Sequence, residues 1–421
     1  MAVGWRAELR FPPRFHCQRA GFKEGCAFMK MHRILAEAAS TIAKSVFREH
    51  RVLDHELAIA FEENPKWGKR DRGFIAETVF ELARWRRSLS FLVESEETTA
   101  LCAAQWVRMG YEIPEWWSYK GRPAAEIIAR EDELSLQARA VRESIPDWID
   151  ALGEAELGAA WDTELAALNQ RASVFLRVNT LRGTRADAIA WLASFNIPVT
   201  EVPGLPDALV LAPGKSLPKS LRMDGRVEIQ DAGSQMIAPL LDPQAGERVI
   251  DACSGAGGKS LHLAALMKNE GRVFGMDVDV KKLVELERRA KRAHANKCVK
   301  SKEIIATTAA DFTHVADRLL IDAPCSGLGT LKRQPDLKWR LKPAALERVQ
   351  KIQKELLTSY SVMLKPGGRL VYATCSILPS ENRAAVDHLL AQGGFSLLEE
   401  CPVSPAATGY DGFYAAALVK A

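Results

Sequence analysis

Residues 248–260 read Arg248-Val-Ile-Asp-Ala-Cys-Ser-Gly-Ala-Gly-Gly-Lys-Ser260, and this stretch decides the fold. Its apolar start predicts a buried strand, and the glycines that follow predict a tight turn into a helix that begins near Lys259. Apolar strands and helical patterns then alternate along the chain. Such repeats predict an α/β fold, a mostly parallel sheet with helices on both faces, in which ligands bind at the carboxyl ends of the strands.

Upstream of this region the pattern differs. We expect helices from about Met31 to Ser144, the second strong one over Phe74–Val93, because apolar residues recur there at helical spacing. A small α+β segment of about 65 residues follows from about Ser173. A chain of 421 residues is too long for one ordinary core, so several domains are expected. Residues 1–28 are Arg-rich, contain Pro12 and Pro13, and are expected to form a disordered extension.

The glycine loop by itself is ambiguous. A Walker loop needs a glycine five residues before Gly258, and that position is Cys253. The dinucleotide fingerprint is met by Gly255 and Gly257, but Ser260 stands where its last glycine belongs. Neither phosphate-binding motif is therefore complete.

Asp277 ends the next expected strand, about 20 residues downstream of the loop, where an acid accepts hydrogen bonds from ribose hydroxyls. A glycine loop without a complete phosphate cradle, followed by a ribose-binding acid, favours S-adenosylmethionine over NAD or ATP. The alternative is that Asp277 only caps the following helix.

Two cysteines lie at the ends of later strands. Cys325 follows the strand 319–322 in Asp322-Ala-Pro-Cys-Ser326, and Cys375 follows the strand 369–372 in Tyr372-Ala-Thr-Cys-Ser376. A single buried cysteine is usually an inert small hydrophobe, but two at the carboxyl ends of strands in one sheet indicate chemistry. The eight cysteines form no CxxC pair, which argues against zinc and for a reducing, cytoplasmic compartment.

These two motifs resemble those of the RNA cytosine-C5 methyltransferase family, the Sun/Nop2-type proteins, and in particular its bacterial 16S rRNA members. Further segments are similar to the family: Phe175–Thr180, Ile229–Gln235, Gln334–Trp339, Ser380–Asn382 and Asp411–Tyr414. The region Lys69–Ile75 is similar to the helical NusB-like domain of the bacterial members, and Pro146–Trp148 to the linker that follows it.

The resemblance implies a Rossmann-like class I methyltransferase domain with a mostly parallel seven-stranded sheet. It implies a helical NusB-like RNA-binding domain over residues 29–150, a small α+β subdomain over 165–235 and the catalytic domain over 236–421. It also implies RNA as the partner, most of all 16S rRNA. We expect a monomer that needs neither a metal nor a membrane.

The resemblance also implies roles for individual residues. Cys375 is the expected nucleophile toward C6 of cytosine, Cys325 the residue of the release step, and Asp322 a hydrogen-bonding partner of the base. The expected cofactor-binding residues are Cys253, Ser254, Gly255, Ala256, Gly257, Gly258, Lys259, Asp277, Asp311 and Asp322. The loop departs from the usual Cys-Ala-Ala-Pro-Gly-Gly-Lys by Ser254, Gly255 and Ala256, which gives it more freedom.

Contacts to RNA phosphates are expected from lysines and arginines. The candidates are Lys66, Lys69, Arg70, Lys332, Arg333, Lys338 and Arg340. For the cluster before Phe74 a merely solvated face is an equal alternative, and the basic stretch Arg288–Arg292 is expected to be solvated. The net charge of +4 fits a nucleic-acid partner without requiring one.

Three other functions compete with RNA cytosine methylation. DNA cytosine methylation uses the Pro-Cys cysteine without a partner Thr-Cys, so the presence of both cysteines favours RNA. An idle RNA-binding assembly factor would not need intact Cys325, Cys375 and Asp322. A dehydrogenase is disfavoured by the incomplete dinucleotide fingerprint. A tRNA substrate in place of rRNA stays open.

Overall fold

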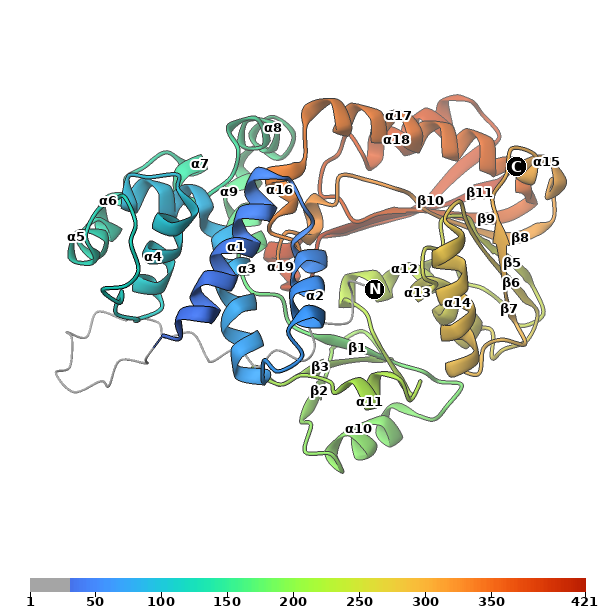
Figure 1. Ribbon diagram of the computed structural model, residues 1–421. Coiled ribbons are helices and arrows are strands. Elements are labelled where there is room, and N and C mark those ends of the chain that lie inside the picture. Colours follow the sequence, from blue (N-terminus) through green and yellow to red (C-terminus); the bar gives the residue numbers. More distant parts are fainter. Residues whose placement is uncertain (1–30) are drawn as a thin grey trace. The chain divides into compact units, whose positions relative to one another are not determined.

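The computed structural model describes residues 31–421, which form two compact units (Figure 1). The first unit comprises the described chain up to Ala155, together with Pro213–Ser216 and Arg333–Arg340. The second comprises Glu156–Ala212, Leu217–Lys332 and Leu341–Ala421. The extension expected at residues 1–28 lies outside the described part. Within residues 31–421, no helix is both long and apolar enough to cross a membrane.

The first unit is helical. Its core is formed by apolar residues of α1 to α4, and Trp106 is fully buried there with its indole N–H donating to Thr78 Oγ1 at 3.1 Å. Helix α3 begins at Lys69, five residues earlier than the sequence pattern predicted, so that Lys69 and Arg70 lie in its first turn. The helices are α1 (Arg33–Arg48), α2 (Leu53–Glu63), α3 (Lys69–Val93), α4 (Thr98–Arg108), α5 (Ala124–Ala129), α6 (Glu131–Leu134), α7 (Arg139–Arg142), α8 (Asp147–Leu157) and α16 (Leu337–Arg340).

The helical geometry of α3 is interrupted at Trp85. Arg87 N–H there donates to Ser144 Oγ at 2.8 Å, so the carbonyl of Ala83 is left for another donor. The indole of Trp339 donates to that carbonyl at 2.6 Å, and Lys338 Nζ donates to the carbonyl of Arg84 at 2.8 Å. These two hydrogen bonds to carbonyls at the break in α3 hold the segment Arg333–Arg340 within the first unit.

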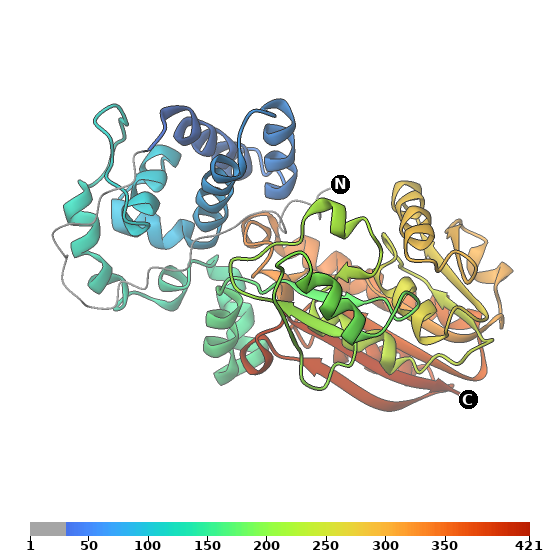
Figure 2. The same ribbon diagram turned by 90° about the horizontal axis from the view of Figure 1, so that it is seen from below.

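The second unit starts at Glu156, near the end of α8, and continues with η3 (Gly158–Ala160) and α9 (Trp161–Leu168). A small antiparallel sheet of strand order β2-β3-β1-β4 follows. This sheet and α10, green in Figures 1 and 2, form the α+β subdomain. Helix α12 (Ala232–Leu240) contacts β1 as well as strands of the large sheet. The subdomain contains β1 (Phe175–Val178), α10 (Arg185–Ala193), β2 (Val199–Glu201), β3 (Ala208–Leu211), α11 (Lys219–Arg222) and β4 (Val227–Ile229).

The large sheet has seven strands in the order β10-β11-β9-β8-β5-β6-β7. Strands β9, β8, β5, β6 and β7 run parallel, and β11 pairs antiparallel with β9 and β10. This confirms the predicted mostly parallel seven-stranded sheet. The strands are β5 (Arg248–Asp251), β6 (Arg272–Asp277), β7 (Val299–Glu303), β8 (Ala316–Asp322), β9 (Leu364–Thr374), β10 (Phe395–Val403) and β11 (Phe413–Lys420).

Helices cover both faces of this sheet (Figure 1). Alternate residues of a strand point to opposite faces, so Val249 belongs to the core on one face and Ile250 to the core on the other. One core includes residues of α12, α13 and α14, and the other residues of α17 and α18. The helices of this part are α13 (Gly258–Leu266), α14 (Val280–Arg292), α15 (Thr308–Asp311), η4 (Leu328–Thr330), α17 (Pro343–Tyr360), η5 (Ser361–Met363), α18 (Arg383–Ala391) and α19 (Pro405–Thr408).

Candidate active site

The candidate site lies at the carboxyl ends of the central parallel strands. Strands β5, β6 and β8 end in Asp251, Asp277 and Asp322, and Cys375 follows directly on β9. Because these strands are parallel neighbours, their ends meet at one edge of the sheet. The sheet topology therefore brings three carboxylates and a thiol, which are distant in the sequence, together at this edge.

The glycine loop between β5 and α13 has a conformation that requires glycine. Gly255 and Gly257 adopt φ of 54° and 87°, in the left-handed region. At Gly257 a Cβ would also lie 2.0 Å from Leu286 Cδ1. At Gly255 and Gly258, in contrast, the place of a Cβ has no atom within 4 Å, so a ligand has room to approach the loop backbone.

Asp277 holds this loop from the neighbouring strand. Its carboxylate accepts hydrogen bonds from Gly255 N–H at 2.9 Å and Asp279 N–H at 2.8 Å. The cap of α14 is Asp279, whose side chain accepts from Lys281 N–H, so Asp277 is not the helix cap that the alternative reading assumed.

Asp251, at the end of β5, is a buried acid. The sequence did not single it out as a site residue. It accepts a hydrogen bond from Ser260 Oγ at 2.6 Å, and burial raises its pKa to about 7. Its Oδ1 and the hydroxyl of Ser254 are buried without a partner among the described residues. Unpartnered polar atoms and open space beside the loop fit a polar ligand such as the nucleoside of S-adenosylmethionine.

Lys259 and Asp322 form an ion pair across the site, with Nζ and Oδ2 2.7 Å apart. Burial alone would lower the pKa of Lys259, but the charge of Asp322 and its hydrogen bond outweigh burial and raise that pKa. Lys259 Nζ also lies 5.8 Å from the ring centroid of Phe413. The site therefore keeps a fixed cation beside the Asp322 carboxylate at neutral pH.

The two cysteines of the sequence motifs face one another, with their Sγ atoms 3.2 Å apart and both thiols free. The hydrogen bond to Cys375 and burial raise the pKa of Cys325 well above that of an ordinary thiol. The geometry of this contact fits either sulfur as the donor. The raised pKa of Cys325 favours Cys325 as that donor, which leaves the Cys375 sulfur as the acceptor that nucleophilic attack requires.

A buried carboxylate, Glu381, joins the two cysteine turns. It accepts hydrogen bonds from Ser326 N–H at 2.7 Å, Ser326 Oγ at 2.5 Å and Ser376 Oγ at 2.5 Å. Gln353 Nε2 donates to it at 3.1 Å. The serines follow Cys325 and Cys375 directly in the sequence, so this one carboxylate sets the distance between the thiols. Sequence reasoning noted Glu381 as part of a similar segment but gave it no role.

Asp311 does not join these groups in the described structure. It is exposed at the end of α15, and its carboxylate accepts a hydrogen bond from Thr307 Oγ1 at 2.9 Å in the same helical turn. The remaining loop residues, Cys253 to Lys259, lie together between β5 and the first turn of α13. Burial raises the pKa of Cys253, so this thiol stays protonated and is not a second nucleophile.

Two of the expected phosphate contacts, Lys332 and Lys338, are wrong because both side chains are buried. Lys338 is 1% exposed and Lys332 is 4% exposed, and both donate to backbone carbonyls, Lys332 to that of Gly409 at 2.8 Å. Arg340 is paired with Asp336 at 2.9 Å. Lys66, Lys69 and Arg70 are exposed, as expected.

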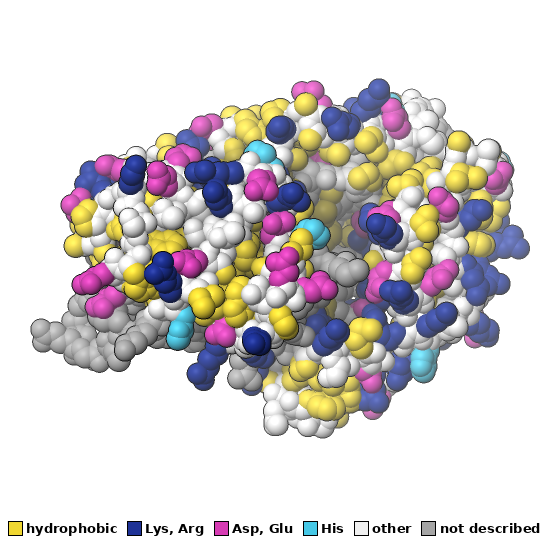
Figure 3. Space-filling model, viewed as in Figure 1, with side chains coloured by type: hydrophobic (Ala, Val, Ile, Leu, Met, Phe, Trp, Pro, Cys, Tyr) yellow, Lys and Arg dark blue, Asp and Glu magenta, His cyan; other side chains and the backbone are white. Residues whose placement is uncertain are grey.

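The basic helix α14 is solvated on one side only. Arg288 and Lys291 are exposed, and lysines and arginines cover the surface over α14 and β7 (Figure 3). Arg289 and Arg292 instead pair with Glu228 of β4, which corrects the expectation that this stretch is solvated throughout.

Comparison with known proteins gives two family matches. Residues 238–419 match the family "16S rRNA methyltransferase RsmB/F", and residues 145–217 match the "Methyltr_RsmF/B-like, ferredoxin-like domain".

The chain is also similar to curated proteins of other organisms. It is 32% identical over 306 residues to the ribosomal RNA small subunit methyltransferase B of Shewanella oneidensis, covering 68% of this chain and 70% of that protein. It is 35% identical to a probable ribosomal RNA small subunit methyltransferase B of Synechocystis sp., over 59% of this chain and 56% of the relative's length.

Solved structures share the fold. PH0851 covers 94% of this chain with a TM-score of 0.77 and 23% identity. A methyltransferase homologue from Pyrococcus horikoshii covers 67% of this chain and 97% of its own, with a TM-score of 0.59 and 25% identity. NSun6 from the same organism, solved with SFG, covers 65% of this chain and 98% of its own, with a TM-score of 0.60 and 20% identity.

Proposed function

We propose that this chain, which belongs to the 16S rRNA methyltransferase RsmB/F family and is thus an S-adenosylmethionine-dependent rRNA methyltransferase, methylates C5 of a cytosine in 16S rRNA. In the proposed reaction, Cys375 forms a covalent adduct with C6 of that cytosine. The observation that carries this proposal is the pair of free thiols 3.2 Å apart at the strand ends, next to the Lys259–Asp322 ion pair. A methyl transfer to an exocyclic amine or a ribose hydroxyl would need no thiol.

The adduct overcomes the low reactivity of C5. The Cys375 thiolate adds to C6, and the electron pair of the C5–C6 double bond makes C5 a nucleophile. Asp322 accepts hydrogen bonds from the exocyclic amine and, once N3 is protonated, from N3–H. When bound, S-adenosylmethionine would supply the electrophilic methyl group for C5 and would leave as S-adenosylhomocysteine.

Release requires a second set of groups. A base removes the C5 proton, the C5–C6 double bond forms again, and the sulfur of Cys375 leaves as a thiolate. We assign Cys325 to this step because its thiol lies 3.2 Å from the leaving sulfur and can donate a hydrogen bond that stabilises the departing thiolate. The target base must be unpaired or flipped out for these contacts to form, at a cost of a few kcal/mol.

For the cofactor, the residues that would hold it are the loop Cys253–Lys259 and the acids Asp277 and Asp322. Asp277 would accept from the ribose hydroxyls with the lone pairs that Gly255 N–H and Asp279 N–H leave free. Asp311, being exposed, supports no such role. The helical part, residues 29–150, is proposed to contribute RNA binding through Lys66, Lys69 and Arg70, and residues 165–235 and 236–421 are proposed as the α+β and catalytic domains.

The test incubates the full chain with methyl-labelled S-adenosylmethionine and separate pools of unmodified 16S rRNA, 23S rRNA and tRNA. We expect label in 16S rRNA only, and bisulfite sequencing should place it at C5 of a cytosine. Label only in tRNA would contradict the substrate, label at another atom would contradict the chemistry, and no label in any pool would favour an assembly factor.

A further inference from the structure

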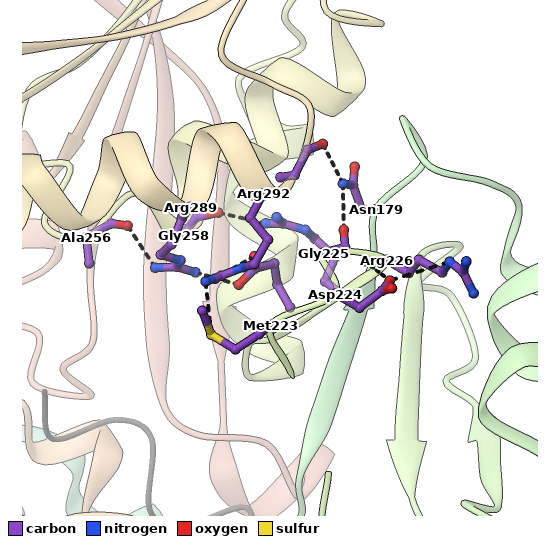
Figure 4. A network of polar contacts seen from close by, with 12 residues as sticks. Asn179, Met223, Asp224, Gly225, Arg226, Ala256, Gly258, Arg289 and Arg292 are labelled. Carbon is purple, nitrogen blue, oxygen red and sulfur yellow. Dashed lines mark hydrogen bonds and ion pairs between the residues drawn. The ribbon is translucent and has the colours of Figure 1, made fainter. Parts of the chain in front are cut away.

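A buried ion-pair network connects the α+β subdomain to helix α14. Glu228 on β4 is 6% exposed, and its carboxylate lies 2.9 Å from Arg289 Nη2 and 3.4 Å from Arg292 Nη2. Figure 4 labels these two arginines beside Ala256 of the glycine loop. Burial alone would raise the pKa of Glu228, but Arg289, Arg292 and Arg177 outweigh it and hold the pKa below its usual value. The carboxylate is therefore charged, and it orients the arginines around it.

Two arginines of this network bind the backbone of the glycine loop. Arg289 Nη1 donates to the carbonyl of Ala256 at 2.8 Å, and Arg177 Nη1 on β1 donates to the carbonyl of Gly258 at 2.7 Å. Arg177 is 2% exposed and also donates to Gln230 Oε1 at 2.5 Å. Hydrogen bonds from charged donors are about twice as strong as neutral ones, and both end on the segment expected to bind the cofactor.

The loop needs external support because of its composition. Residues 255–258 contain three glycines and no proline, so the free loop has many conformations to lose on binding a ligand. Inside the catalytic sheet it is held by Asp277 at Gly255 N–H. The contacts at Ala256 and Gly258 come from Arg289 on α14 and Arg177 on β1.

Backbone contacts beside the network join the α+β subdomain to the end of α14. Asn179 Nδ2 donates to the carbonyls of Gly225 at 2.9 Å and Ala293 at 2.8 Å, which joins the subdomain to the end of α14. A Cβ at Gly225 would lie 2.3 Å from the carbonyl oxygen of Arg292, so the two backbones pack without space for a side chain. The segment that precedes Glu228 is therefore packed directly against the end of α14.

We propose that Arg177, Glu228 and Arg289 are positioning residues that hold the glycine loop in the shape that binds S-adenosylmethionine, so that the α+β subdomain contributes to cofactor affinity. This rests on the proposed cofactor role of residues 253–259. None of the three side chains needs to touch the cofactor, because each acts on the loop through backbone carbonyls or through Arg289.

The test measures S-adenosylmethionine binding to the full chain by calorimetry without RNA, so it does not depend on which RNA is methylated. Arg289→Met keeps the aliphatic stem but removes the donor to Ala256, and we expect about tenfold weaker binding. Arg288→Met is the matched control, because Arg288 is the exposed neighbour on the same helix. In turnover assays Arg289→Met should raise KM for S-adenosylmethionine while KM for RNA and kcat at saturating cofactor stay unchanged.

Two conservative variants guard against a folding defect. Arg289→Lys should restore part of the affinity, because a cation beside Glu228 is kept. Glu228→Gln, which preserves size, should weaken cofactor binding, and its effect combined with Arg289→Met should be less than additive. The proposal would be overturned if Arg289→Met and Arg288→Met bound S-adenosylmethionine with equal affinity. It would also be overturned if Arg289→Met lost kcat and RNA affinity along with cofactor affinity. Wild-type chain that binds no S-adenosylmethionine would instead refute the cofactor role of the loop.

Discussion

The Sγ atoms of Cys325 and Cys375 lie 3.2 Å apart, although the residues follow two different strands and are 50 positions apart in the sequence. Glu381 maintains this distance by accepting hydrogen bonds from the serine that follows each cysteine. The raised pKa of Cys325 favours Cys325 as the donor in this contact and Cys375 as the acceptor.

Removing Glu381 should impair catalysis more than cofactor binding. We expect Glu381→Ala to lower kcat by about 100-fold, since a displacement of about 1 Å at reacting groups has this effect. The affinity for S-adenosylmethionine, measured by calorimetry, should change little. Glu399→Ala is the control, because Glu399 is an exposed acid paired with Arg369. Unchanged kcat in Glu381→Ala would show that the cysteine turns hold their distance without it.

Mild oxidation should inactivate the enzyme reversibly. Hydrogen peroxide would take two hydrogens from the thiols, giving water and a Cys325–Cys375 disulfide, because the sulfurs are already in contact. Mass spectrometry of peptides should find this crosslink, and dithiothreitol should restore activity. Peroxide inactivation that dithiothreitol does not reverse, without the crosslink, would contradict this.

Asp251 should make stability depend on pH. Its folded-state pKa of about 7 lies above the unfolded value of about 3.8, so the folded state binds the proton more tightly between these values. Stability should therefore fall as the pH rises from about 4 to 7, and the full penalty should remain above pH 7. Asp251→Asn removes the titration, so its melting temperature should vary less over this range than that of the wild type. Parallel curves for the two proteins would argue against a buried, titrating Asp251.

Exposed and buried lysines should differ in RNA binding. Lys69→Gln with Arg70→Gln should reduce the slope of log affinity against log salt by about 1.4 to 1.8, or about 0.7 to 0.9 for each lost phosphate contact. Lys338→Met is the control, since Lys338 is buried against the carbonyl of Arg84, and it should leave the slope unchanged. Filter binding over a salt series gives both slopes. If only Lys338→Met changed the salt slope, Lys338 rather than Lys69 and Arg70 would be the phosphate contact.

Strand periodicity predicted the mostly parallel sheet, and motif position placed both cysteines at its strand ends, because both are local properties. The number of seven strands followed from the family resemblance. It failed where the answer depends on tertiary packing. Lys338 looked like a phosphate contact, but the break in α3 at Trp85 leaves carbonyls that its segment binds. Arg289 looked solvated because its partner, Glu228, is 61 residues away.

The same limit applies within the site. The roles of Glu381 and Asp251 were missed because a carboxylate gains them only when folding brings serines to it. Asp311 was expected in the cofactor site from the family resemblance, whereas it is exposed at the end of α15.

The most direct test of the proposed chemistry is the covalent protein–RNA adduct formed by cysteine variants, resolved by denaturing gel electrophoresis with labelled 16S rRNA and S-adenosylmethionine. Cys325→Ala should accumulate the adduct, because attack by Cys375 proceeds and release is slowed. Cys375→Ala should form none and lose activity by at least about 100-fold. An adduct in Cys375→Ala and none in Cys325→Ala would make Cys325 the nucleophile and contradict the mechanism.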